Sequence, residues 1–180
     1  MNRLEKVLVR LKEMNFSPDM GNFRDKLIIQ KVVCLLELMG AELGYRSSFS
    51  LYVRGPYSPT LTKELYEGMN IIKDSNTSGG LTKKEKEQLS KLYEISDHLN
   101  PDMLEIMSTY GYLIKECNND EKTAVSNLKR LKSFYPESKL AIGISKTKEL
   151  FLKLSENEIN DIKTEFKEWE NTAILDRTEE

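Results

Sequence analysis

The sequence predicts a mainly α-helical fold, namely a multi-helix domain with one small β-sheet. Most segments place apolar residues three and four positions apart, which is the spacing of one helix face. Only one segment, Ser48 to Arg54, alternates apolar and polar residues as a half-buried strand does. The chain has 180 residues, 39% of them hydrophobic and 31% charged, which is typical of a globular domain.

Residues 1–73 are predicted to form a helix, helix, strand and helix module. The first helix, Asn2 to Met14, carries its apolar residues on one face. The second helix, Arg24 to Met39, is apolar on nearly every side and ends at Gly40, a residue suited to the position after a helix. We therefore expect the second helix to be buried at the centre of the core.

The run Gly55-Pro56-Tyr57-Ser58-Pro59 is predicted to be a rigid turn after the strand. Each proline fixes its own φ and disfavours helical geometry in the residue before it. Ser58 as N-cap and Pro59 as first residue then begin a third helix, with an apolar stripe at Leu61, Leu65, Met69 and Ile72. This order of elements is compatible with a winged-helix-like module.

Residues 81–171 are predicted to form a helical C-terminal half packed on the first module. A polar loop, residues 73–80, separates the two halves. Capping signals predict helices at about 82–98, 102–116, 121–134, 136–154 and 155–169, with capping boxes at Thr82/Glu85 and Ser155/Glu158. Residues 172–180 are expected to be a frayed acidic tail.

The residue inventory argues against an enzyme, a cofactor and a metal site. His98 is the only histidine, and it is expected near a helix C-terminus. Cys34 and Cys117 lack CxxC spacing, so two reduced structural thiols are favoured over a disulfide. No apolar run is long enough to span a membrane and the start lacks a secretion signal, so we expect a cytoplasmic protein.

A stretch of about forty residues resembles the YwgA-like family of bacterial and archaeal proteins and, more distantly, the Panacea (SocA-like) antitoxin domain. The residues that carry the resemblance are Lys26, Gln30-Lys31, Gly40, Leu43-Gly44-Tyr45, Tyr52, the run Arg54 to Pro59 (RGPYSP), Leu61 and Leu65-Tyr66. The run Glu105 to Leu113 resembles the second conserved helix of the family. The resemblance implies a protein that binds a partner, as Panacea domains bind and neutralise toxins.

Two groups of candidate residues follow. The partner-binding group is Tyr52, Arg54, Tyr57, Lys63 and Tyr66, and the structural motif is Lys26, Gln30, Lys31, Gly55, Pro56, Ser58 and Pro59. Gln30 and Lys31 are polar residues within an apolar helix, so we expect them to bond the carbonyls of the turn. Arg54 either faces a partner or braces the turn, and the tyrosines either contact a partner or pack on Tyr66.

The first hypothesis is a non-enzymatic regulatory protein-interaction module, antitoxin-like or defence-associated, with a protein partner and an undetermined oligomeric state. The alternative is a winged-helix-like transcription regulator that binds nucleic acid. Residues 1–60 carry nine basic and six acidic residues, whereas the remainder carries 18 basic and 23 acidic residues. The third helix carries Lys63 but also Glu64 and Glu67, and carboxylates oppose phosphate binding, so the protein partner ranks first.

Overall fold

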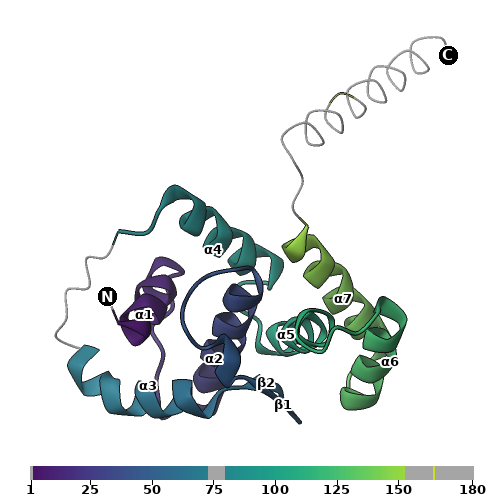
Figure 1. Cartoon of the computed structure of the whole chain (residues 1–180), viewed down its shortest axis with the longest axis horizontal. Coiled ribbons are helices and arrows are strands. Elements are labelled where there is room, and N and C mark those ends of the chain that lie inside the picture. Colours follow the sequence, from purple (N-terminus) through teal and green to yellow (C-terminus); the bar gives the residue numbers. More distant parts are fainter. Residues whose placement is uncertain (1, 73–79, 153–163, 165–180) are drawn as a thin grey trace. The chain divides into compact units, whose positions relative to one another are not determined.

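The computed structural model describes residues 2–72, 80–152 and 164. Met1–Leu150 form one compact unit and Phe151–Glu180 a second, and each is considered by itself. The described residues form seven helices and one two-stranded antiparallel sheet, so the predicted fold class is confirmed (Figure 1). The elements are α1 (Arg3–Glu13), α2 (Phe23–Leu38), the 3-10 turn η1 (Arg46–Ser48), β1 (Ser50–Tyr52), β2 (Gly55–Tyr57), α3 (Pro59–Ile72), α4 (Lys83–Ile95), α5 (Pro101–Lys115), α6 (Glu121–Leu131) and α7 (Glu137–Phe151).

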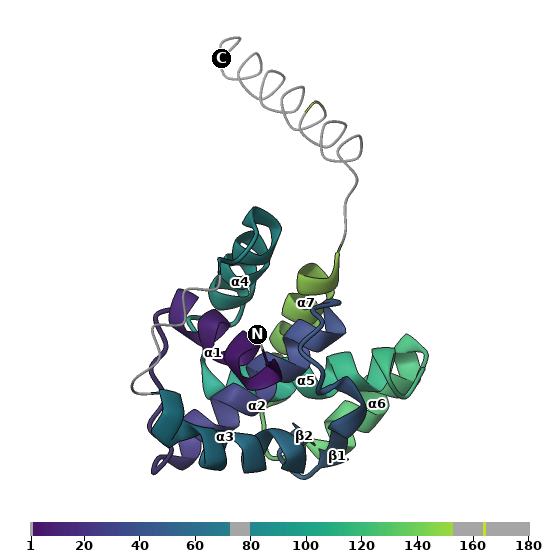
Figure 2. The same cartoon turned by 60° about the vertical axis from the view of Figure 1, so that its left-hand side comes forward.

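Helix α2 lies at the centre of the core, as its sequence predicts. Every residue from Leu27 to Leu38 is buried, and α5 packs along this helix (Figures 1 and 2). Gly40 follows the C-cap Met39 of this helix, and its φ of +94° suits a residue without a side chain. The amides of Gly40 and Ala41 donate to the last free carbonyls of α2, at 3.0 and 2.9 Å, which closes the helix.

The predicted strand and turn are instead one β-hairpin, so two expectations are corrected. The strand expected at residues 48–54 is only Ser50–Tyr52, and Gly55-Pro56-Tyr57 is its antiparallel partner rather than a turn. The chain reverses at Val53 and Arg54, where Tyr52 pairs with Gly55. Gly55 has a φ of +84°, and a left-handed glycine directly after a two-residue turn is a common way to close a hairpin.

Three helices end earlier than predicted. Helix α7 stops at Phe151 rather than at residue 154, and the backbone leaves helical geometry at the C-termini of the other two. Helix α4 stops at Ile95 rather than near His98, since Asp97, His98 and Leu99 all have φ between 54° and 62°. Helix α6 stops at Leu131 rather than Phe134, because its C-cap Lys132 leaves helical geometry. The capping box predicted at Thr82 and Glu85 is confirmed.

Some expectations fall outside the described residues. These are the loop at 73–79, the helix at 155–169, the acidic tail at 172–180, and the side chains of Met69 and Ile72. Within the described part, Leu61 and Leu65 of the α3 stripe are buried, and Ser58 caps α3 by accepting a hydrogen bond from the Leu61 amide at 3.1 Å.

Candidate functional site

Buried polar side chains of α2 hold the backbone of the hairpin. The Gln30 amide group donates to the Ser58 carbonyl at 3.0 Å and accepts from the Ser58 N–H at 2.9 Å. Lys31 donates from its Nζ to the Pro56 carbonyl at 2.7 Å. The bonds to turn carbonyls expected of Gln30 and Lys31 are therefore present. Burial lowers the pKa of Lys31 to about 8.

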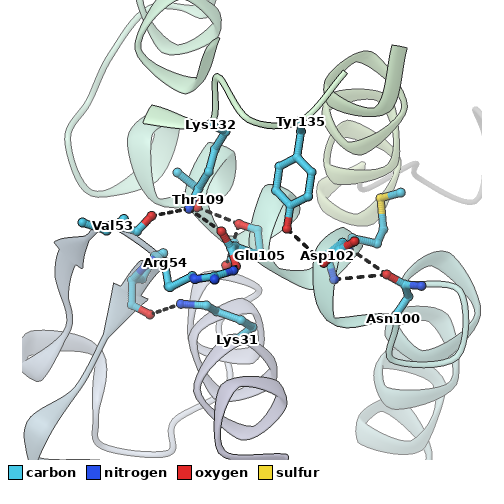
Figure 3. A network of polar contacts seen from close by, with 12 residues as sticks. Lys31, Val53, Arg54, Asn100, Asp102, Glu105, Thr109, Lys132 and Tyr135 are labelled. Atoms are coloured by element: carbon cyan, nitrogen blue, oxygen red, sulfur yellow. Dashed lines mark hydrogen bonds and ion pairs between the residues drawn. The ribbon is translucent and has the colours of Figure 1, made fainter. Parts of the chain in front are cut away.

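The tip of the hairpin is held by a second buried cluster, which centres on Glu105 of α5 (Figure 3). Lys132 donates to Glu105 Oε1 at 2.7 Å and to the Val53 carbonyl at 2.6 Å, so one ammonium group ties the tip to α5. Arg54 approaches the other carboxylate oxygen of Glu105 at 3.6 Å. Burial lowers the pKa of Lys132, while its bond to Glu105 acts in the opposite direction.

The hairpin also approaches α5 closely at Gly55. A Cβ atom at this position would lie 2.5 Å from Thr109 Oγ1 and 3.4 Å from Lys31 Nζ. Thr109 cannot easily withdraw, because its hydroxyl donates to the Glu105 carbonyl at 2.6 Å. Only glycine fits between the α5 backbone and the hairpin, and its positive φ is required there as well.

The outer side of this clamped hairpin presents side chains to solvent. We call Tyr52, Val53, Arg54 and Tyr57 the hairpin surface. The side chain of Arg54 is 59% exposed, and Val53 and Tyr52 are 76% and 53% exposed. Val53 is an apolar residue of the segment predicted as a half-buried strand, but it lies at the turn of the hairpin and is exposed there. The Tyr52 and Tyr57 rings meet edge to face at 5.6 Å, so they pack on one another rather than on Tyr66.

The other two candidate binding residues lie on α3, and each contacts a charged side chain. Lys63 is exposed and pairs with Glu67 at 3.8 Å. Tyr66 accepts a hydrogen bond from Lys26 Nζ at 3.0 Å, and the same ammonium lies over its ring. Lys26, which the sequence assigned to the structural motif, therefore positions Tyr66 rather than the hairpin.

A cavity of about 420 Å³ opens beside the hairpin tip. We call it the arginine pocket. The residues that line it include Phe23, Arg24 and Leu27 of α2, Arg54 at the hairpin tip, and Asp102 and Glu105 of α5. Lys139 donates to Asp102 at 2.6 Å and Tyr135 donates at 3.0 Å, and these bonds hold the pKa of Asp102 below its usual value. The carboxylate of Asp102 is therefore ionised and paired at neutral pH.

The sequence patterns did not identify several residues of this region, namely Glu105, Thr109, Lys132, Phe23 and Arg24. Glu105 carried a signal in the sequence, because it is the one charged residue in the run Glu105 to Leu113. The structure shows that its side chain is only 1% exposed, which is rare for a glutamate without a partner. Lys132 carried none, since it sits in a charged segment and reaches the hairpin only through the tertiary fold. Thus the two segments that resemble family motifs, around RGPYSP and Glu105, lie against each other.

The described residues contain no group of three or more His, Cys, Asp or Glu residues placed to hold a metal ion. His98 packs its ring edge to face on Tyr93, with 4.9 Å between ring centroids. Cys34 is a buried free thiol and Cys117 an exposed one. In residues 2–72 and 80–152, no helix has the length and apolar character to cross a membrane.

No protein-family model, curated protein or solved structure matches this chain.

Proposed function

We propose that this chain is a non-enzymatic regulatory module that binds a protein partner through the hairpin surface, and that it is antitoxin-like in the sense of the family it resembles. The observation that carries the proposal is the contrast between the two sides of the hairpin. Its backbone is fixed by the buried Gln30, Lys31 and Lys132, whereas Val53 at its tip is 76% exposed. Val53 and Tyr52, which is 53% exposed, together give the fixed tip an apolar and aromatic surface of the kind that protein partners cover.

Rigidity and composition both favour a protein contact. A preorganised loop loses little conformational entropy when it binds, so more of the interaction free energy contributes to affinity. Tyrosine and arginine are the residue types enriched at the centres of protein interfaces. The hairpin surface supplies Tyr52, Tyr57 and Arg54 within a few residues of chain.

The winged-helix alternative receives less support from the contacts of α3, the helix expected to read DNA. Glu64 accepts hydrogen bonds from Arg3 and from the Tyr45 hydroxyl, and Glu67 lies beside Lys63. The positive charge of Lys63 is therefore offset by the carboxylate of Glu67. A DNA phosphate that approached α3 would also meet the carboxylates of Glu64 and Glu67. Selection of a defined motif from a randomised DNA pool would favour the alternative.

Photo-crosslinking in the native host tests the proposal. A photo-reactive residue is placed at Val53 or, as a matched control, at Ile142, an apolar residue of α7 that is half exposed. We expect Val53 to crosslink one defined protein that Ile142 does not, and Tyr52→Ala to reduce its recovery. If the neighbouring gene encodes a small toxin-like protein, its product is the expected partner. Equal crosslinking from both positions, or none from Val53, would contradict the proposal.

A further inference from the structure

We infer that the arginine pocket binds a carboxylate side chain of an acidic, partly apolar peptide segment. This inference rests on the proposed function, because it names the chemistry by which the partner is recognised beside the hairpin surface. It starts from the charges that line the pocket. Both carboxylates of the wall already have a lysine partner, and Arg54 only shares Glu105 with Lys132, at the longer distance of 3.6 Å.

The pairing distances show which charges are left over. Glu105 is bonded to Lys132 at 2.7 Å, so the 3.6 Å approach of Arg54 adds a second cation to a carboxylate that is already neutralised. Asp102 is neutralised by Lys139 at 2.6 Å. Arg24 makes no side-chain hydrogen bond or ion pair with another described residue. The pocket therefore carries an excess of positive charge on Arg24 and Arg54.

The donors are suited to a carboxylate. Guanidinium groups present parallel N–H donors that match the two oxygens of a carboxylate. Arg54 is 59% exposed and Arg24 is exposed, so both guanidinium groups are accessible to a ligand, and Arg54 would give up only its 3.6 Å approach to Glu105. A carboxylate between them would receive charge-assisted hydrogen bonds from two separate elements, the N-terminal turn of α2 and the hairpin tip.

The apolar wall of the pocket specifies more than an anion. Phe23 is 64% exposed although it begins the most buried helix of the fold, and it lines the same cavity as the arginines. Leu27 contributes a second apolar residue one turn further along α2. A peptide in which an apolar side chain neighbours Asp or Glu would cover Phe23 while its carboxylate reaches the arginines.

The apolar part of the lining favours a peptide over other anions. A free phosphate ion has no apolar group to cover Phe23 and Leu27. A nucleic acid requires a row of cations along its backbone, whereas the pocket offers two. At about 420 Å³, the cavity has room for one or two peptide side chains.

Selection from a random-peptide display library on the purified full chain tests the inference. We expect the enriched peptides to share an Asp or Glu beside an apolar residue. A fluorescent copy of one enriched peptide should lose affinity on the order of tenfold or more with Arg24→Gln, and separately with Arg54→Gln. Arg130→Gln is the matched control, since Arg130 is an exposed arginine of α6 outside the pocket, and it should change affinity less than about twofold.

Several outcomes would overturn the inference. These are a selection that enriches no peptides, enriched peptides without acidic residues, unchanged affinity in both pocket variants, or displacement of the peptide by inorganic phosphate or duplex DNA at similar concentrations. Circular dichroism of each variant verifies that the helices are retained. If Val53 still crosslinks its partner in Arg24→Gln and Arg54→Gln with undiminished yield, the inference fails while the proposed function stands.

Discussion

Lys132 and Glu105 form an ion pair with an N–O distance of 2.7 Å, and neither side chain is accessible to solvent beyond 2%. The same lysine also holds the Val53 carbonyl, so the pair fixes the tip of the hairpin against α5. A buried charge is stable only when it is paired and hydrogen-bonded. Glu105 is therefore the centre on which the shape of the hairpin surface depends.

Lys132→Met should destabilise the protein by about 3 to 5 kcal/mol, because it leaves the Glu105 carboxylate buried without its partner. The free energy of unfolding from chemical denaturation measures this loss. The double variant Lys132→Met, Glu105→Leu should recover part of the lost free energy of unfolding, because the buried carboxylate is also removed. The control Lys129→Met removes an exposed pair with Glu137 and should cost less than about 1 kcal/mol. A similar small cost for Lys132→Met would contradict the role of the buried pair.

Gly55→Ala should cost about 2 to 5 kcal/mol, because it adds both left-handed backbone strain and a collision with Thr109. Gly40→Ala is a matched control: its φ is also positive, at +94°, but a Cβ there meets nothing within 4 Å. It should cost only the backbone strain of about 1 to 2 kcal/mol. Adding Thr109→Ala to Gly55→Ala should recover part of the lost stability, because it removes the collision. If Gly55→Ala and Gly40→Ala cost the same free energy, the close approach of Gly55 to Thr109 is unimportant for stability.

Stability should rise with pH above about 8 through Lys31, whose pKa burial lowers from 10.5 to about 8. Below pH 8 the lysine is protonated in both states; between pH 8 and 10.5 the unfolded chain binds more protons, so raising the pH favours the fold. The slope should reach at most about 1.4 kcal/mol per pH unit, or about 3 kcal/mol in total. Chemical denaturation of the wild type and of Lys31→Met from pH 7 to 10 measures how the free energy of unfolding changes with pH. If this free energy changes with pH equally in the two proteins, the expectation is refuted.

Arg54→Ala should change the free energy of unfolding by no more than about 1 kcal/mol, since the side chain is mostly exposed and its ion pair is long. The carbonyls of the turn do not depend on it, because Lys31 and Lys132 bond those of Pro56 and Val53. Recovery of the crosslinked partner should fall much more than stability does. A loss of stability as large as that of Lys132→Met would make Arg54 a structural brace instead.

The sequence predicted the parts of the fold that local patterns control. The capped helices, the buried α2 and the partnering of Gln30 and Lys31 with RGPYSP all follow from spacing, capping residues and the need to satisfy buried polar groups. The hairpin was missed because two prolines suggested a turn, although Pro56 occupies a strand position opposite Leu51.

The arginine pocket was beyond sequence reasoning for a different reason. It joins the start of α2, the hairpin tip and the start of α5, and no local pattern places these three segments together. Phe23 and Arg24 look like ordinary surface residues of a first helical turn when only their neighbours in sequence are considered. Their significance comes from the residues across the cavity.

The bond from Lys132 to the Val53 carbonyl spans 79 positions of the chain. A product released by the ribosome before residue 132 would contain the whole RGPYSP motif and yet lack the ammonium that holds its tip. The bond that fixes the hairpin tip can therefore form only after residue 132 has been synthesised, because it is a contact of long sequence separation. A partner that requires the fixed tip would engage a chain that includes Lys132 but not one that stops before it.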